Sequence, residues 1–132
     1  MPITYVTDQL PTVDQVIDLY RSAGLRRPLE DPPRLAAMLK HSNLVVSAWE
    51  DELLVGLARS VTDFNYCCYL SDLAVRAAYK HRGIGKQLVA LTKEQVGPES
   101  MLLLLSAPEA MHYYPKIGLE AVNNGFFIKR SY

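Results

Sequence analysis

The chain has 132 residues, a net charge of zero and 21% charged residues, which limits the classes of protein to which it can belong. This length suits a single domain over residues 1–132 that buries roughly two-thirds of its unfolded surface. The basic residues do not form a stripe, so we expect neither a nucleic-acid-binding protein nor a membrane-surface protein. The longest apolar run, Met101–Leu105, is far too short to cross a bilayer.

The cysteines and the N-terminus favour a cytoplasmic protein. Cys67 and Cys68 are adjacent, so on a strand they face opposite sides and a disulfide is not expected. Free thiols are typical of the cytoplasm, which is the predicted location. Residues 1–4 lack the charged and apolar regions of a signal peptide, and we expect none. The histidines and cysteines have no ligand spacing, so no metal site is predicted.

Hydrophobic periodicity predicts helices and an antiparallel hairpin in the first half of the chain. Thr12 caps the first helix and Gly24 ends it. An acidic turn, Glu50-Asp51-Glu52, joins two strand-like runs. The predicted elements are a strand over residues 3–6, a helix over 13–23, a helix from Pro32 to about His41, and strands over 44–49 and 53–61.

The second half of the chain predicts a strand and a helix, followed by another strand, a short helix and two final strands. The turn Asn123-Asn124-Gly125 indicates a C-terminal hairpin. The run Met101–Leu105 is predicted to be a fully buried strand. The predicted elements are a strand over 66–75, a helix over 83–96, a strand over 101–105, a short helix over 109–117, and strands over 119–122 and 126–129. The order β-α-α-β-β-β-α-β-α-β-β describes an α/β fold with an α+β mixed sheet.

The segment Tyr79–Leu88 joins a strand to a helix through two glycines, and this arrangement suits an anion. Glycine lets backbone N–H groups approach a phosphate closely, and a helix N-terminus offers unpaired donors. The third glycine of a dinucleotide fingerprint is missing after Gly85, and the P-loop pattern does not occur. A plain tight turn is the structural alternative.

This segment resembles the acyl-CoA pyrophosphate loop of the GNAT superfamily of N-acetyltransferases, [Q/R]-x-x-G-x-[G/A]. Lys80 stands where the family has Gln or Arg. The element order is that of the GNAT fold, whose sheet splays between the fourth and fifth strands. The resemblance therefore implies acetyl-CoA as the acetyl donor. The cofactor-binding residues that it implies are Leu73, Ala74, Val75, Lys80, His81, Arg82, Gly83, Ile84, Gly85, Lys86 and Tyr113.

The segment Ala110–Leu119 is similar to a second GNAT signature, A-x-x-F-Y-x-x-x-G-F, with Tyr113 on the Phe and Tyr114 on the Tyr. Tyr114 is then the expected general acid, because a phenol of pKa ~10 can protonate a departing thiolate of pKa ~8.5. Packing is the other role open to this pair. Pro115 is unusual in that helix, because proline removes a backbone hydrogen bond.

Asp72 is the preferred general base, because it lies on the central strand beside the expected splay. A backbone-binding role for this aspartate is equally open. Weaker candidates for the base are Glu109, His112, Asp63 and Glu30. The sequence offers no nucleophile elbow or supported Cys–His pair, so direct transfer to the amine is expected.

Four short segments are similar to the plastid and cyanobacterial type of serotonin (arylalkylamine) N-acetyltransferase, which also has an Asp at the place of Asp72. The resemblance suggests a small aromatic amine as the acceptor. The rings of Tyr66, Tyr69, Phe64 and Phe126 are then the candidates to stack on it. Two other functions stay open, a non-catalytic acetyl-CoA sensor and a protein or peptide N-acetyltransferase. A free strand edge at Phe126–Lys129 leaves a homodimer open. The segments are Arg27–Leu29, Val55–Arg59, Asp72–Val75 and Gly118–Ala121.

Overall fold

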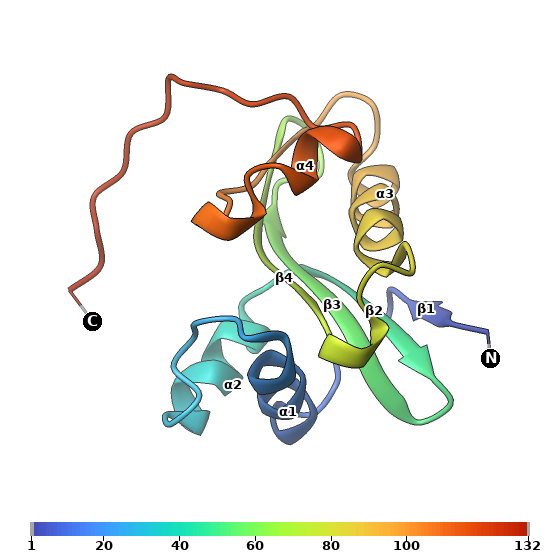
Figure 1. The fold of residues 1–132 in the computed structure, drawn as a ribbon. Helices are drawn as coiled ribbons and strands as arrows, with labels where there is room; N and C mark the ends of the chain where they lie inside the picture. The colour runs from blue at the N-terminus through green and yellow to red at the C-terminus, as the bar shows by residue number, and fades with distance from the viewer. Residues whose placement is uncertain (1, 132) are drawn as a thin grey trace.

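The computed structural model describes residues 2–131, which form one five-stranded sheet with helices on both faces (Figure 1). Within this range, no helix has the length and apolar character needed to cross a membrane. The elements, in chain order, are β1 (Thr4–Val6), α1 (Val13–Ala23), α2 (Pro32–Lys40), β2 (Leu44–Glu50), β3 (Leu53–Thr62), β4 (Cys67–Val75), the 3₁₀ turn η1 (Ala77–Tyr79), α3 (Ile84–Val96), β5 (Met101–Leu103), the 3₁₀ turn η2 (Pro108–Ala110) and α4 (Tyr113–Lys116).

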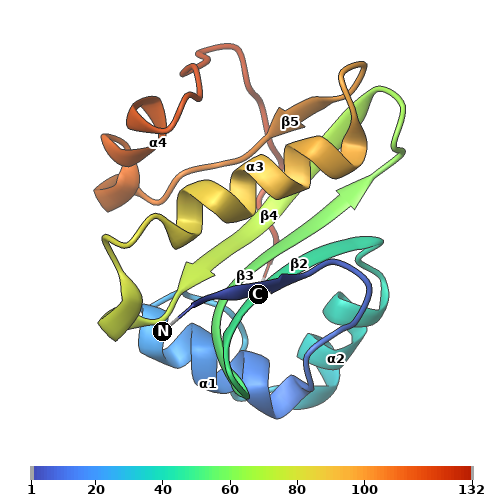
Figure 2. The same ribbon diagram turned by 90° about the vertical axis from the view of Figure 1, so that its right-hand side faces the viewer.

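The sheet has the strand order β1-β2-β3-β4-β5, and it is antiparallel except for the last pair, in which β5 runs parallel to β4. Helix α3 covers one face, and α1 and α2 cover the lower half of the other (Figure 2). Each face has its own apolar core, which we call the α3 layer and the α1–α2 layer. The predicted mixed sheet is therefore confirmed.

Local sequence signals explain the ends of α1. The Thr12 side chain accepts a hydrogen bond from the Gln15 N–H, while the Gln15 side chain accepts one from the Thr12 N–H. These two bonds form a capping box. Gly24 ends the helix in the left-handed conformation at φ 74°, which costs glycine little. Both helix boundaries agree with the prediction.

A β-bulge at Ser71 changes which face each residue of β4 presents. Asp72 pairs with Arg59 and Leu70 with Ser60, so Ser71 has no partner on β3. Before the bulge, the even-numbered residues Cys68 and Leu70 pack in the α3 layer. After it, the odd-numbered Leu73 and Val75 pack there, while Ala74 packs in the α1–α2 layer. The bulge therefore turns Asp72 toward α1.

Two predicted elements near the C-terminus differ from the structure. The strand over Met101–Leu105 ends at Leu103 and is not fully buried, because it is the edge of the sheet and Met101 is 56% exposed. The helix predicted over residues 109–117 is divided into η2 and α4. Helix α4 begins at Tyr113, which places Pro115 in its first turn, where the missing N–H has no helical partner to lose.

The predicted hairpin over residues 119–129 is wrong. Residues 119–131, which we call the C-terminal arm, hold no strand. Within the described chain, no backbone hydrogen bond involves residues 120–131. The arm runs from α4 away from the body, on the side of the sheet opposite α3 (Figures 1 and 2). A two-stranded hairpin is marginal unless it packs on a further surface, and in this structure the arm does not join the sheet.

Candidate active site

The glycine loop opens α3 with free amides, as the sequence predicts. The first helical hydrogen bond is donated by the Gln87 N–H to the Gly83 carbonyl, at 3.1 Å. The amides of Ile84, Gly85 and Lys86 precede that bond and point out of the helix N-terminus. His81 and Gly83 both have left-handed backbones, with φ of 67° and 80°. Such a turn before a helix forms an anion-binding concavity.

The basic side chains of this loop are held by neighbours. The Lys80 ammonium donates to the carbonyl of Ala23 at the end of α1, at 3.3 Å. The Arg82 guanidinium lies 5.0 Å from the centre of the Tyr79 ring, and the Tyr79 hydroxyl donates to Glu50 at 2.8 Å. These contacts fix the loop against α1 and β2.

Strands β4 and β5 separate just before the glycine loop. They pair only through Cys67–Tyr69 and Met101–Leu103, while β4 continues to Val75. The edge of β4 that faces the gap is therefore unpaired over its last six residues. The Arg76 N–H bonds to Val55 on β3, and because amide direction alternates along a strand, the amides of Val75 and Leu73 face the gap.

Ala74 differs from the two residues beside it. By the same alternation its amide faces β3, and its side chain is buried in the α1–α2 layer. Of the predicted strand contacts to a cofactor, the geometry therefore supports Leu73 and Val75 but not Ala74.

The two tyrosines of α4 lie beside the start of α3. A Cβ on Gly85 would meet the Tyr113 hydroxyl at 2.5 Å, so this hydroxyl occupies the space that glycine leaves. The rings of Tyr113 and Tyr114 meet edge to face, with their centres 5.2 Å apart. Burial, and then the neighbouring Tyr113, raises the pKa of Tyr114 above its ordinary value. Tyr114 therefore holds its proton throughout the neutral range.

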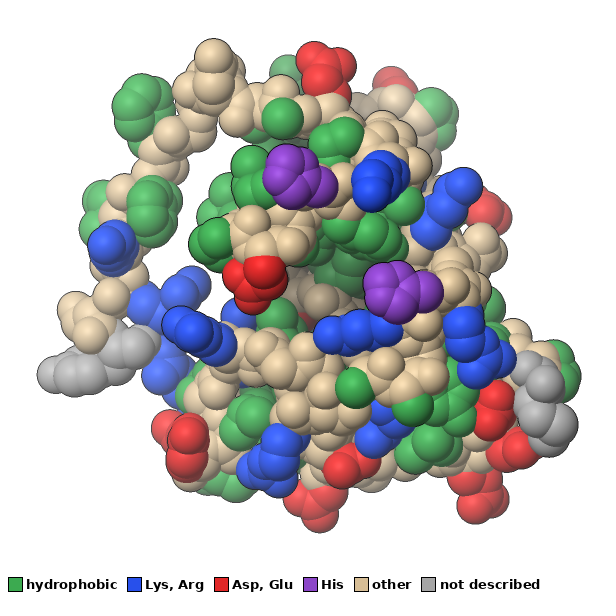
Figure 3. Space-filling view, viewed as in Figure 1, with side chains coloured by type: hydrophobic (Ala, Val, Ile, Leu, Met, Phe, Trp, Pro, Cys, Tyr) green, Lys and Arg blue, Asp and Glu red, His purple; other side chains and the backbone are tan. Residues whose placement is uncertain are grey.

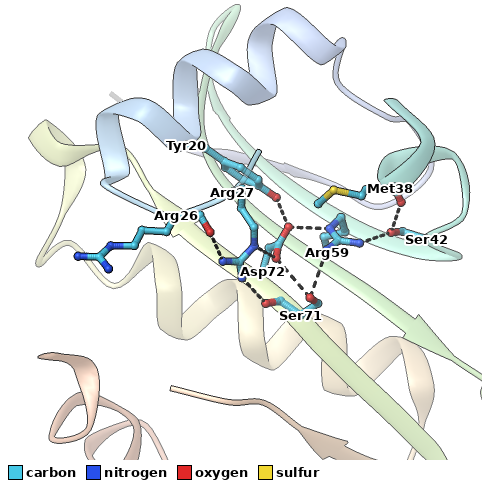
Figure 4. A network of polar contacts seen from close by, with 8 residues as sticks. All are labelled: Tyr20, Arg26, Arg27, Met38, Ser42, Arg59, Ser71 and Asp72. Atoms are coloured by element: carbon cyan, nitrogen blue, oxygen red, sulfur yellow. Dashed lines mark hydrogen bonds and ion pairs between the residues drawn. The ribbon is translucent and has the colours of Figure 1, made fainter. Parts of the chain in front are cut away.

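Asp72 lies in a buried polar network between β4 and α1 (Figure 4). Its carboxylate accepts from Arg27 Nε at 2.6 Å, from Arg59 Nε at 2.6 Å and from the Tyr20 hydroxyl at 2.8 Å. The Ser71 hydroxyl donates to it at 3.3 Å. The side chain has no exposed surface.

This environment does not favour Asp72 as the general base. Burial alone would raise the pKa of its carboxyl, but hydrogen bonding and charge from Arg59, and the charge of Arg27, outweigh burial and lower the pKa below its ordinary value. A base needs an accessible lone pair and a raised pKa. The carboxylate instead holds Arg27, whose guanidinium also donates to the Ser71 carbonyl at 2.9 Å. It thereby ties the loop after α1 to the bulge.

Asp63, a weaker candidate for the base, is engaged in a turn. Its carboxylate accepts hydrogen bonds from the N–H groups of Asn65, Tyr66 and Cys67. These N–H groups, Cys67 foremost, lower the pKa of Asp63 to about 2. Such a carboxylate is a poor proton acceptor at neutral pH.

Two hollows are visible on the surface, and the arrangement of the described side chains also bears on metal binding. Figure 3 shows Lys, Arg and His side chains around a hollow in the middle of the face seen in Figure 1. A hollow of about 610 Å³ lies elsewhere, between β1 and the start of α1, and its lining includes Trp49 but none of the predicted site residues. Among residues 2–131, no group of three or more His, Cys, Asp or Glu side chains is arranged to hold a metal ion.

Comparison with known families identifies the fold. The model of the acetyltransferase (GNAT) domain matches residues 20–129, which is most of the chain. The chain belongs to the GNAT acetyltransferase family. The predicted family is thus confirmed, while acyltransferase activity and the arylalkylamine subgroup stay predictions.

Individual relatives agree with a GNAT domain. A histone acetyltransferase from Glycine max is 28% identical over 76% of this chain and 48% of its own length. The chain spans about half the length of the curated relatives that it matches. A probable acetyltransferase from methicillin-resistant Staphylococcus aureus has the same fold, with a TM-score of 0.81, 20% identity, and coverage of 98% of this chain and 100% of that one. An aminoglycoside N-acetyltransferase in complex with CoA has a TM-score of 0.75, 15% identity, and coverage of 98% and 95%.

The sequence predicted the GNAT loop and the α4 tyrosines but missed the partners of Asp72. A signal was present. Arg59 lies inside the apolar run Leu53–Val61, and an arginine at a core position of a strand needs a buried partner. Asp72, on the neighbouring strand, was the candidate. Arg27 had no such signal, because it lies in a loop.

Proposed function

We propose that this domain transfers the acetyl group of acetyl-CoA directly to a primary amine of a small molecule. The observation that carries the proposal is the separation of β4 from β5 immediately before a helix N-terminus with free amides. An unpaired strand edge suits the amide-bearing pantetheine arm, and the free amides suit the pyrophosphate. The family match supports the same donor.

The cofactor contacts follow from the loop and the strand. The amides of Ile84, Gly85 and Lys86 would bind the pyrophosphate, with positive charge from Lys80, His81 when protonated, Arg82 and Lys86. The amides of Leu73 and Val75 would pair with the pantetheine arm. The aminoglycoside enzyme bound to CoA supports this donor by its shared fold.

The reaction then needs one proton donor from the chain. The amine nitrogen attacks the thioester carbonyl carbon, a C–N bond forms and the C–S bond breaks. The departing thiolate takes the proton of the Tyr114 hydroxyl, and water later returns a proton to the phenolate. Because Asp72 and Asp63 are both engaged as described, we propose that water takes the proton that the amine loses.

An arylalkylamine is the acceptor class that we propose. Three aromatic side chains in the turn before β4 and on the part of β4 that pairs with β5 are exposed, which suits stacking on an aromatic ring. They are Phe64, Tyr66 and Tyr69. We keep the cytoplasmic location as a prediction, since Cys67 and Cys68 are both free thiols.

The first experiment measures acetyl-CoA binding by calorimetry, with acetyl-pantetheine, which lacks the pyrophosphate, as the control donor. We expect binding that requires the pyrophosphate. Free-thiol release is then followed with arylalkylamines, aliphatic amines and a lysine-rich histone-tail peptide. Turnover with the peptide alone would favour the protein acceptor suggested by the histone acetyltransferase relative. Binding without any turnover would favour a sensor, and no binding at all would remove the proposal.

A further inference from the structure

The bulge at Ser71 lies where β4 leaves β5. The last residue pair between these two strands is Tyr69 with Leu103, and Ser71 follows Tyr69 by two residues. Among the described residues, Ser71 is paired with no residue of β3 or β5. A bulge bends its strand and increases the local twist, so the backbone of Ser71 sets the direction in which the rest of β4 runs. The amides of Leu73 and Val75, which face the gap, lie just beyond it.

Two arginines bind the polar groups of Ser71 in place of a neighbouring strand (Figure 4). Arg27 Nη2 donates to the Ser71 carbonyl at 2.9 Å, and Arg59 Nη2 donates to the Ser71 hydroxyl at 3.1 Å. The Asp72 carboxylate joins the two arginines, because Arg27 Nε donates to one of its oxygens and Arg59 Nε donates to the other. Arg59 belongs to β3, whereas Arg27 reaches the bulge from the loop between α1 and α2.

The guanidinium of Arg27 is fixed in orientation as well as in position. Its third nitrogen, Nη1, donates to the carbonyl of Arg26 at 2.6 Å, so each of the three nitrogens has an acceptor. The Arg27 side chain is 27% exposed, against 10% for Arg59 and none for Asp72. Arg27 is therefore the member of this charged group that can be replaced with the least disturbance of the core.

We propose that Arg27 is a positioning residue for acetyl transfer. By holding the Ser71 carbonyl, it fixes the bend of β4 and so directs the amides of Leu73 and Val75 toward the pantetheine arm of acetyl-CoA. This role rests on the proposed function. The pyrophosphate site at the start of α3 belongs to another element, so Arg27 acts on the pantetheine end of the donor and not on its pyrophosphate end.

The first test compares two ligands that share the pyrophosphate. Acetyl-CoA carries the pantetheine arm, whereas 3′-phospho-ADP ends at the pyrophosphate. In Arg27→Met, which removes all three donors, the affinity for acetyl-CoA should fall about tenfold, because a small displacement of binding groups is costly. The affinity for 3′-phospho-ADP should stay within about twofold of wild type. Calorimetry measures both.

The variants separate positioning from stability. Arg27→Met should stay folded by circular dichroism, because Asp72 keeps Arg59 and the Tyr20 hydroxyl as donors. Arg27→Lys returns a positive charge beside Asp72 and should restore stability but not the affinity for acetyl-CoA, since one ammonium nitrogen cannot replace both Nε and Nη2. The matched control is Arg26→Met, because the Arg26 side chain is exposed and points away from the network in Figure 4. It should leave both affinities within about twofold of wild type.

Hydrogen exchange reports on the strand itself. The Ala74 amide faces β3 just beyond the bulge, and in Arg27→Met it should exchange at least about tenfold faster, while amides in α3 keep their rates. An unchanged affinity for acetyl-CoA, an equal loss for both ligands, full recovery in Arg27→Lys, or an unchanged Ala74 amide would each overturn the role of Arg27. A wild-type chain that binds neither ligand would remove the proposed function, and this role with it.

Discussion

At the scale of single residues, Asp72 shows how burial and charge set the role of a carboxylate. Four donors reach its two oxygens, and two of these donors are arginines. The network holds one negative and two positive charges, so it keeps a net positive charge beside the bulge.

Replacing Asp72 by Asn should lower the free energy of unfolding by about 3 kcal/mol, because Arg59 would lose its buried partner. The carboxyl pKa is lowered in the folded protein, so its stabilisation is present above the unfolded value of 3.8 and is lost as the pH falls through the folded pKa. The difference between wild type and variant should therefore narrow in acid. Urea unfolding at pH 7 and at pH 3 measures it.

The control for this variant is Asp8→Asn, the same chemical change at an exposed position before α1. It should leave the free energy of unfolding within about 0.5 kcal/mol of wild type. If the deficit of Asp72→Asn were the same at both pH values, the two arginines would not be the cause.

The two neighbouring tyrosines offer a matched pair for the general acid. Tyr114→Phe should lower kcat by about 100-fold or more, with little change in the KM for acetyl-CoA, because the proton is needed only as the thiolate leaves. Tyr113→Phe should keep kcat within about threefold, since its hydroxyl faces Gly85. Steady-state kinetics measures both. A larger loss of kcat in Tyr113→Phe would transfer the role of acid to Tyr113.

At the scale of elements, a close contact between Tyr113 and Gly85 joins α4 to the start of α3. The Tyr113 hydroxyl fills the space beside Gly85, while nothing lies within 4 Å of a Cβ on Gly83. The first glycine therefore serves backbone conformation, and the second serves packing. Gly83 is therefore needed for its left-handed backbone, and Gly85 for the space that the Tyr113 hydroxyl occupies.

Gly85→Ala should lower kcat about tenfold, because the new methyl displaces the end of the Tyr113 side chain and with it the α4 tyrosine pair. Adding Tyr113→Phe removes the displaced hydroxyl and should restore most of kcat. Gly83→Ala should lower the free energy of unfolding by about 1–2 kcal/mol, the cost of a left-handed backbone in alanine. Kinetics and urea unfolding of these variants separate the two effects. Failure of the double variant to recover would show that the contact with Tyr113 does not transmit the effect.

The elements themselves could largely be predicted from the sequence. Periodicity and caps predicted α1, α2 and α3 within a few residues, because those signals are local. The bulge at Ser71 could not be predicted, since no residue pattern near it requires an extra residue in the strand. The direction of Asp72 depended on that bulge. Pro115 indicated that the last helix would be interrupted. The residue at which α4 begins could not be predicted, because it depended on packing against α3.

At the scale of the whole molecule, the two sides of the gap are joined by little strand pairing. Only three residue pairs connect β4 to β5, and β4 continues for six residues beyond them. The failed C-terminal hairpin belongs to the same scale. Its turn signal was local, but residues 119–131 do not pair with the free edge of β5, and such long-range pairing is not encoded in a turn.

Acetyl-CoA should therefore stabilise the whole domain by bridging the gap. At a ligand concentration of 100 times Kd the expected gain is about 2.7 kcal/mol, which corresponds to a rise in Tm of roughly 10 °C. Differential scanning calorimetry at one fixed protein concentration measures it. Acetyl-pantetheine at the same concentration should give a much smaller rise. Equal shifts from the two compounds would mean that the glycine loop does not bind the pyrophosphate.

The extra residue at Ser71 has a consequence for how this strand can change over time. Up to Leu70 the residues of β4 that face α3 have even numbers, and beyond the bulge the residues that face α3 have odd numbers. Deleting Ser71 would let Asp72 follow Leu70 directly and still pair with Arg59, so Asp72 would keep facing α1 while Leu73 and Val75 kept facing α3. Removing the bulge while keeping Ser71 would instead turn the Asp72 carboxylate into the apolar layer beneath α3. The bulge therefore absorbs one residue, and the strand can lose that residue without exchanging its faces.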